Sequence, residues 1–179
     1  MKKKYMKKKV VTIITAIICL IIVVLCFKHR YDERLKKAAG EIVVKSEDEK
    51  IDVYKGDCVF KKILEGKELE NLYYVENEKK IEIEFFNETF KNLKVREYII
   101  NKKGDYRFKD KGTDLEVEKD GRKASFVLKP NMLTLFSSLS RDYQKGNTIK
   151  GYSIEYEMYG EKFSFSFVIR GDAAINNAY

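Results

Sequence analysis

Residues 151–169, GYSIEYEMYGEKFSFSFVI, decide the fold, because apolar and polar side chains alternate on both sides of a glycine turn at Gly160. This period of two predicts a β-hairpin with one apolar face. A shift of one residue in the pairing would move every apolar side chain of the second strand into water, so the register is strongly specified. The apolar residues that share a face are Tyr152, Ile154, Tyr156 and Met158 before the turn, and Phe163, Phe165, Phe167 and Ile169 after it.

The same alternation recurs earlier in the domain. Residues 79–86 alternate clearly, and residues 114–119 and 122–129 alternate around Asp120-Gly121, a dipeptide typical of two-residue hairpin turns. Residues 132–143 are compatible with a short helix or a bent strand, and we expect a helix or irregular structure there. Weaker strands are predicted at residues 42–45, 51–54, 58–64, 69–75, 93–101 and 106–108.

The closing hairpin has Gly151 and Tyr152 at the head of its first strand, a tight glycine turn and alternating phenylalanines in its second strand. This pattern resembles the last two strands of many bacterial immunoglobulin-like modules. The resemblance implies an immunoglobulin-like sandwich of two packed antiparallel sheets. We therefore expect an all-β fold, and an α+β fold is the alternative.

A long apolar run, VVTIITAIICLIIVVLCF, begins at Val10 and ends at Phe27, without charge, glycine or proline. As a helix it would be about 27 Å long, which matches a hydrocarbon core of roughly 30 Å. Charged residues follow the run where a cleaved signal peptide would have small ones, so an uncleaved signal anchor is favoured. Cys19 and Cys26 follow large apolar residues, which argues against a lipid-modified cysteine.

The formal net charge is +8, and much of it comes from a dense block of lysines before the apolar run. The basic residues just after the run are interspersed with Asp32 and Glu33. Under the positive-inside rule we expect a cytoplasmic N-terminus, a domain outside the membrane, and a tail attracted to anionic lipid headgroups. The domain itself has mixed charge, which argues against nucleic-acid binding. The tail lysines are Lys2, Lys3, Lys4, Lys7, Lys8 and Lys9.

The chain is thus divided into four predicted parts. The segment after the membrane run is rich in helix formers and stops at Gly40, so we interpret it as a stalk. Cys58 is the one cysteine of the domain, so the fold depends on its core and not on disulfides, and a bacterial cell surface fits this cysteine usage. The parts are a basic cytoplasmic tail (1–9), a transmembrane signal anchor (10–27), a helical stalk (28–40) and an extracytoplasmic β-sandwich domain (41–179).

The residues that usually carry catalysis are sparse in the domain. His29, the one histidine, lies beside the apolar run, which excludes His-based triads, Cys–His dyads and histidine metal sites in the domain. Cys58 alternates with Phe60 and is interpreted as a small buried apolar residue in a strand. We expect no enzyme activity, no catalytic residue and no cofactor. Three pairs of carboxylates are interpreted as solvent-facing strand positions: Glu82 with Glu84, Glu116 with Glu118, and Glu155 with Glu157.

Four weaker motifs are interpreted as incidental. Aspartates at loop ends do not have the spacing of an EF-hand, so we interpret them as solvent-exposed turn residues. We expect no metal site. An integrin-type tripeptide follows the last strand, where glycine and aspartate are common anyway. One tripeptide matches the N-glycosylation acceptor, and several tyrosines could form a binding face, although most such residues pack in cores. The motifs are Asp105, Asp110, Asp114 and Asp120; Arg170-Gly171-Asp172; Asn87-Glu88-Thr89; and Tyr73, Tyr74, Tyr98, Tyr143 and Tyr179.

Together these features predict a membrane-anchored, extracytoplasmic bacterial module that binds or scaffolds without chemistry. Its expected partners are the membrane, through residues 10–27, anionic lipid headgroups, and an unidentified envelope protein or polymer. An alternative is the external domain of a secretion or conjugation assembly, which a helix over residues 132–143 packed on a curved sheet would favour. An envelope hydrolase ranks last. The sequence leaves the ligand and the oligomeric state open.

Overall fold

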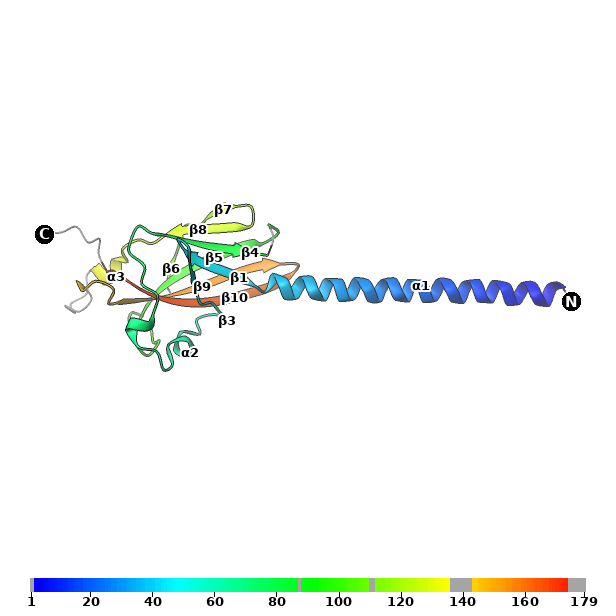
Figure 1. The fold of residues 1–179 in the computed structure, drawn as a ribbon, viewed down its shortest axis with the longest axis horizontal. Helices are drawn as coiled ribbons and strands as arrows, with labels where there is room; N and C mark the ends of the chain where they lie inside the picture. The colour runs from blue at the N-terminus through cyan, green and yellow to red at the C-terminus, as the bar shows by residue number, and fades with distance from the viewer. Residues whose placement is uncertain (1, 87, 110–111, 136–142, 174–179) are drawn as a thin grey trace. The chain divides into compact units, whose positions relative to one another are not determined.

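The computed structural model describes residues 2–86, 88–109, 112–135 and 143–173, and it divides the chain into two compact units. The first unit is helix α1, which spans Lys2–Ala39 and is followed by Gly40 (Figure 1). The predicted membrane run of residues 10–27 falls partly on residues 10–14 and 16, whose side chains lie outside the described part. Among the described residues, no helix is both long enough and apolar enough to cross a membrane.

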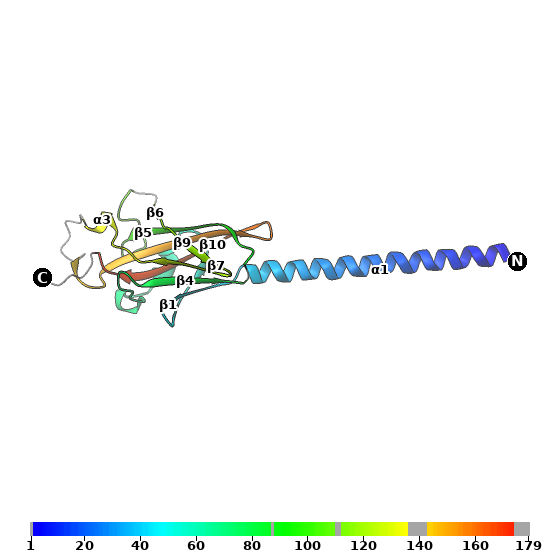
Figure 2. The same ribbon diagram turned by 90° about the horizontal axis from the view of Figure 1, so that it is seen from above.

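The second unit is mostly β-structure and forms two antiparallel sheets (Figures 1 and 2). The first sheet has the strand order β2-β1-β4-β8-β7, and the second has the order β3-β10-β9-β5-β6. The strands of the first sheet are β1 (Ile42–Ser46), β2 (Glu49–Ile51), β4 (Lys80–Phe85), β7 (Glu118–Asp120) and β8 (Lys123–Val127). Those of the second are β3 (Tyr54–Lys55), β5 (Lys91–Ile100), β6 (Thr113–Asp114), β9 (Thr148–Met158) and β10 (Glu161–Gly171).

The closing hairpin forms in the predicted register. Tyr156 pairs with Phe163, and Tyr152 pairs with Phe167, so the alternating apolar residues of both strands share one face. The pairing extends beyond the predicted bounds, from Thr148 to Gly171. The predicted strands over residues 42–45, 79–86, 93–101 and 122–129 are also confirmed, as β1, β4, β5 and β8.

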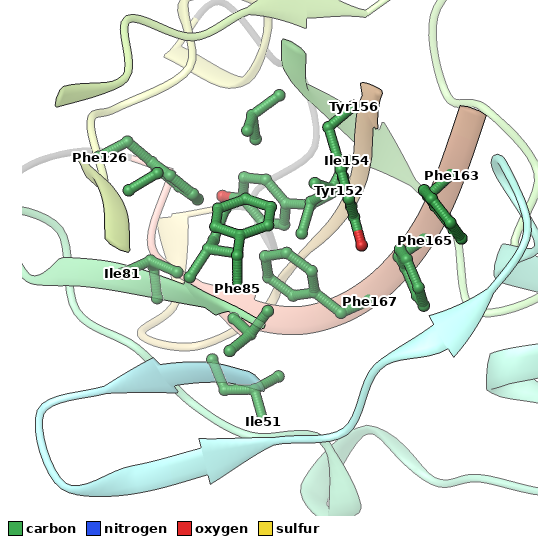
Figure 3. Close-up of a cluster of buried hydrophobic side chains, with 14 of the residues drawn as sticks. Ile51, Ile81, Phe85, Phe126, Tyr152, Ile154, Tyr156, Phe163, Phe165 and Phe167 are labelled. Atoms are coloured by element: carbon green, nitrogen blue, oxygen red, sulfur yellow. The ribbon is translucent and has the colours of Figure 1, made fainter. Parts of the chain in front are cut away.

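The main core lies between the two sheets, as Figure 3 shows. Ile81 and Phe85 reach it from β4, and the alternating residues of β9 and β10 reach it from the second sheet. Aromatic rings form much of it, with the Tyr152 and Phe167 rings stacked at 4.7 Å between centroids. Burial of this apolar surface is the main stabilising term, at roughly 25 cal/mol per Å² removed from water.

A second apolar cluster covers the outer face of the β9–β10 sheet. It is supplied mainly by the segment between β3 and β4, which contains helix α2 (Phe60–Leu64) and the 3₁₀ helix η1 (Leu69–Asn71). Figure 1 shows α2 on the side of β10 opposite β4 and β8. Phe60 is fully buried against Gly151, where a Cβ would lie 2.8 Å from the Phe60 ring. A glycine at residue 151 is therefore required by close packing.

Strands predicted at residues 58–64 and 69–75 were wrong, because residues 60–64 form α2 and residues 69–71 form η1, and Tyr74 makes only an isolated bridge with Arg170. Their apolar residues, among them Ile63 and Leu64, bury one side of short helical turns against the sheet, so tertiary burial outweighs local alternation. The predicted strand at 51–54 was also wrong, since Ile51 ends β2 of one sheet and Tyr54 begins β3 of the other.

Two further strand predictions need correction. Residues 114–119 are not one strand, because the chain crosses there from β6 of the second sheet to β7 of the first. Residues 106–108 contribute only an isolated bridge between Tyr106 and Ile100. Of the ambiguous segment 132–143, the structure describes a short helix, α3 (Met132–Leu135), while residues 136–142 lie outside the described part.

Candidate functional site

Polar side chains gather inside the sandwich where β9 begins. Lys150 and Tyr152 lie on the inward-facing side of β9, and Glu97 of β5 pairs across the sheet with Tyr152. The side chains of Lys150 and Glu97 are 0% and 5% exposed, and Lys150 Nζ lies 3.6 Å from Glu97 Oε2. An amine and a carboxylate thus face each other out of contact with solvent.

Two hydrogen bonds hold the Glu97 carboxylate. The Tyr152 hydroxyl donates to Oε2 at 2.6 Å, and Asn131 Nδ2 donates to Oε1 at 2.6 Å. Complete burial, followed by the neighbouring Glu97 carboxylate, raises the pKa of Tyr152 well above its usual value. Tyr152 therefore keeps its proton and acts as a donor to the carboxylate.

Lys150 makes two more contacts. Its Nζ donates to the backbone carbonyl of Lys129 at 3.1 Å and to Asn77 Oδ1 at 3.4 Å. Asn77 is fixed in turn, because its Nδ2 donates to the backbone carbonyl of Asp172 at 3.3 Å. The amine therefore has a carboxylate, a carbonyl and a carboxamide as acceptors, which matches its three N–H donors. We call Glu97, Lys150, Tyr152, Asn77 and Asn131 the Glu97 cluster.

An open groove of about 760 Å³ lies beside this cluster, and Glu97 and Asn131 form part of its wall. Residues 113–118, where the chain crosses between sheets, form one side, and residues 125–133 form the other. Its volume falls within the range of about 300–1,000 Å³ typical of ligand pockets. Val127 and Met132 expose apolar side chains there, at 45% and 63% of their surface. This groove is the candidate binding site.

The carboxylate pair Glu82 and Glu84 lies away from the groove, on the outer face of the first sheet. Lys123 Nζ lies 2.8 Å from Glu82 Oε1, and Arg122 lies 2.7 Å from Glu84 Oε1. The hydrogen bond from Lys123 is the main reason that the pKa of Glu82 lies below its usual value. Glu82 is therefore ionised near neutral pH and unsuited to donating a proton.

The other two carboxylate pairs lie in different places. Glu116 and Glu118 are exposed and line the groove. Glu155 and Glu157 lie on the outer face of β9, where Asn92 Nδ2 donates to Glu157 Oε2 at 2.9 Å. None of these pairs meets another acid–base group across an enclosed space in the described part of the chain.

The aspartates considered as a calcium site do not come together. Asp105 Oδ1 pairs with Lys61 Nζ at 2.6 Å, and Asp114 Oδ1 pairs with Arg96 Nε at 2.5 Å. Asp110 lies outside the described residues, and Asp120 ends β7 at the hairpin turn. Over the residues that the structure describes, no group of three or more metal-ligating side chains is found.

Cys58 was wrongly predicted to lie in a strand. It precedes α2 in the left-handed region, with φ of 51°, and it is half-buried. Its Sγ donates to Asp57 Oδ1 at 3.1 Å. Burial raises the pKa of the Cys58 thiol, and the Asp57 carboxylate adds to this effect, while hydrogen bonds from Tyr106 and Tyr98 lower the pKa. A thiol held protonated is a poor nucleophile.

The side chains of the Arg170-Gly171-Asp172 tripeptide make contacts within the domain. Asp172 is 4% exposed, and its carboxylate accepts hydrogen bonds from the Tyr74 hydroxyl at 2.8 Å and from the Gly146 backbone N–H at 2.7 Å. The Arg170 guanidinium lies 5.5 Å from the centre of the Tyr74 ring. A receptor for this tripeptide needs an exposed carboxylate, and this one is buried.

The described tyrosines that were considered as a binding face differ in their surroundings, and the Tyr74 hydroxyl donates to the buried Asp172. Tyr73 packs against the core between the sheets, whereas Tyr98 belongs to the cluster on the outer face, where burial raises its pKa to about 12. Tyr143 is 53% exposed. Tyr179 lies outside the described residues, as does Asn87 of the glycosylation acceptor.

Sequence reasoning missed Glu97 and Lys150, the two charged residues of the Glu97 cluster. The signal was present in the closing hairpin. When the alternation of Tyr152, Ile154 and Tyr156 is extended toward the N-terminus, Lys150 falls on the same inward face. A lysine at an inward position needs a partner, and Glu97 is that partner.

Comparison with protein-family models, with curated proteins and with solved structures yields no match for this chain.

Proposed function

We propose that the chain is a single-pass membrane protein whose domain, residues 41–179, is an extracytoplasmic immunoglobulin-like module with a non-catalytic binding role. Its N-terminus is cytoplasmic, and its partner is an envelope protein or polymer. Support comes from the strand order, the N-terminal segment and the groove, in that order.

The strand order supports the immunoglobulin-like assignment. Immunoglobulin domains place strands A, B, E and D in one sheet and strands G, F and C in the other. Here β1, β4, β8 and β7 are neighbours in the first sheet and follow the order A-B-E-D. In the second sheet β10, β9 and β5 follow the order G-F-C, and β6 takes the place of the additional strand C′. Strands β2 and β3 are additions at the edges.

The N-terminal segment supports the membrane anchor. The apolar side chains of α1 that are described are exposed on every side, which is unfavourable for a helix in water. Leu20 and Phe27, for example, are 66% and 69% exposed. The lysine block before the run and the mixed charges after it favour a cytoplasmic N-terminus. The other strongly exposed apolar residues of this stretch are Ile17, Ile18, Ile21, Ile22, Val23, Val24 and Leu25.

The groove is the observation that carries the binding role. It combines exposed apolar side chains at Val127 and Met132 with two exposed acids, Glu116 and Glu118. Such a surface suits an extended segment of a partner that has both apolar and basic side chains. The groove is open, and the acids Glu116 and Glu118 on its lining are exposed to solvent, so the groove is better suited to binding a partner than to catalysis on a bound substrate.

Accessibility in intact cells tests the location. A tag added after Tyr179 is expected to be cut by external protease without breaching the membrane, while a tag before Met1 is protected. A C-terminal tag that is reached only after lysis would contradict the proposal.

Site-specific crosslinking tests the binding role. A photoreactive residue replacing Val127, in the groove, is expected to crosslink to an envelope component in intact cells. The matched control replaces Lys162, whose side chain is 86% exposed and lies outside the groove lining. The crosslink should weaken in a Glu116→Lys variant. Equal crosslinking at both positions, or none at Val127, would overturn the assignment of the groove.

A further inference from the structure

The Glu97 cluster contains the three functional groups required to form an amide bond between side chains. Lys150 supplies an amine, Asn77 a carboxamide, and Glu97 a carboxylate. Lys150 Nζ lies 3.4 Å from Asn77 Oδ1 and 3.6 Å from Glu97 Oε2, so the amine touches both of the other groups. The contact with Oδ1 places the amine beside the Asn77 carboxamide, whose carbonyl carbon Cγ is bonded to that oxygen. Holding two reacting groups together in this way lowers the entropic part of the barrier.

We propose that Lys150 and Asn77 become joined by an intramolecular isopeptide bond, formed with Glu97 as the catalytic acid–base group. The Glu97 carboxylate takes a proton from the Lys150 ammonium, and the free amine attacks Asn77 Cγ, forming the new C–N bond. Glu97 then passes this proton to Asn77 Nδ2, and the Cγ–Nδ2 bond breaks. The departing ammonia takes the second proton from the Lys150 nitrogen and leaves as ammonium. Neither an oxidant nor a reductant is needed, and Glu97 is regenerated.

The surroundings favour this reaction. The Lys150 side chain has no exposed surface, and the Tyr152 and Phe167 rings stack on one another next to it along the same face of the sheet. In such an interior an ammonium and a carboxylate both lose hydration, so transfer of the proton between them relieves the cost of two buried charges. The exclusion of water also protects the amide from hydrolysis.

Asn77 is better placed than Asn131, the other carboxamide of the cluster. Asn77 presents its carbonyl oxygen to Lys150 Nζ. Asn131 instead presents its amide nitrogen to Glu97, at 2.6 Å, while its carbonyl oxygen accepts the backbone N–H of Leu133 at 2.9 Å. The carbonyl carbon next to the amine is therefore that of Asn77.

The bond would link the two sheets. Asn77 lies in the turn that leads into β4 of the first sheet, and Lys150 lies in β9 of the second. In antibody domains a disulfide joins the strands B and F, which occupy the positions of β4 and β9. Here Cys58 is the one cysteine beyond α1, so that disulfide cannot form. The amide would serve the same purpose in a form that reducing agents do not break.

Mass spectrometry of the full-length protein purified in detergent tests the proposal. The intact mass is expected to fall below the sequence mass by one ammonia, about 17 Da. After trypsin digestion, the peptide of residues 68–79 should be found joined to that of residues 146–162, with Lys150 uncleaved. An intact mass equal to the sequence mass, or a link from Lys150 to Asn131, would overturn it.

Three variants distinguish this bond from other reactions that release ammonia, such as succinimide formation at an exposed asparagine. Lys150→Met, Asn77→Ala and Glu97→Gln are each expected to have their full sequence mass. The matched control, Asn92→Ala, changes an exposed asparagine and should retain the loss. A Lys150→Met protein that still lacks one ammonia would overturn the proposal. The wild-type peptide map decides the matter even where a variant fails to fold.

Discussion

The two ends of strand β9 lie in one sandwich interior but differ in chemistry. Toward its C-terminus, Ile154 and Tyr156 pack in the apolar core, where the Phe85 ring lies 4.9 Å from that of Tyr156. Toward its N-terminus, Lys150 meets a carboxylate, a carbonyl and a carboxamide. The same alternation thus points residues inward at both ends, but non-directional packing stabilises one end and fixed polar geometry the other.

The difference predicts how each end fails. Truncation of an apolar side chain leaves a cavity, and the loss of stability depends on how far the neighbouring side chains can relax into it. A polar site that loses one partner leaves a buried charge without compensation, and relaxation offers little relief. Substitutions at the two ends should therefore differ in how much they lower the free energy of unfolding. They should also differ in how far a second substitution restores it.

The largest effect is expected for Glu97→Ala. Removal of the carboxylate leaves the Lys150 amine buried without its charge partner, and the free energy of unfolding should fall by about 3–5 kcal/mol. Denaturant titration followed by tyrosine fluorescence measures this. The double variant Glu97→Leu with Lys150→Met should recover part of the loss, because no charge remains buried. A single variant within 1 kcal/mol of wild type would show that the polar end does not depend on this pair.

At the apolar end, Ile154→Ala should lower the free energy of unfolding by about 2–5 kcal/mol, because Ile154 is fully buried and the truncation leaves a cavity. Its effect should add to that of Lys150→Met, since the two side chains share no polar partner. The control Val127→Ala removes an exposed side chain and should change little. Strong non-additivity would contradict the separation of the two ends.

Tyr152→Phe should cost about 1.5–3 kcal/mol near neutral pH, because Glu97 loses a hydrogen bond. The pKa of Tyr152 is raised in the folded state above its usual value of 10.0, so the unfolded state ionises first and stability falls as the pH rises above 10. Without this hydroxyl the alkaline slope should decrease by about 1.4 kcal/mol per pH unit. An unchanged slope between pH 10 and 11.5 would show that this hydroxyl does not contribute.

The smallest effect is expected on the outer face of the same strand. Gly151→Ala would place a Cβ 2.8 Å from the Phe60 ring, and overpacking of this kind costs about 1–3 kcal/mol. Combination with Phe60→Leu should relieve part of the clash. If Gly151→Ala is as stable as wild type, α2 can shift away from β9 and the outer cluster is loosely packed.

Much of the fold could be predicted from the sequence where each strand is half-buried. The closing hairpin and strands β4, β5 and β8 alternate, and alternation reports one apolar and one polar face directly. Alternation was misleading between Cys58 and Asn71, because that segment packs on the outer face of a sheet and its buried apolar residues lie mainly in short helical turns. Alternation was also misleading at residues 114–119, where apolar and polar residues alternate although the chain is crossing between the sheets.

The candidate site was less predictable than the fold. Residues on the groove, such as Glu116 and Glu118, were noticed only as solvent-facing acids, since nothing local shows that residues 125–133 lie opposite them. Glu97 and Lys150 are far apart in the chain, and neither has a distinctive neighbour in the sequence.

The sequence by itself determined the strand faces, the register of the closing hairpin and the division between an apolar N-terminal run and an alternating domain. These follow from local periodicity, because the side chains of a strand must separate into a wet and a dry face. Only the tertiary structure decided the order of strands in the two sheets, the covering of the outer face by α2, and the meeting of Glu97, Lys150 and Asn77. Contacts of this kind depend on which elements pack together, and the energy of a buried charge depends on all the neighbours that surround it.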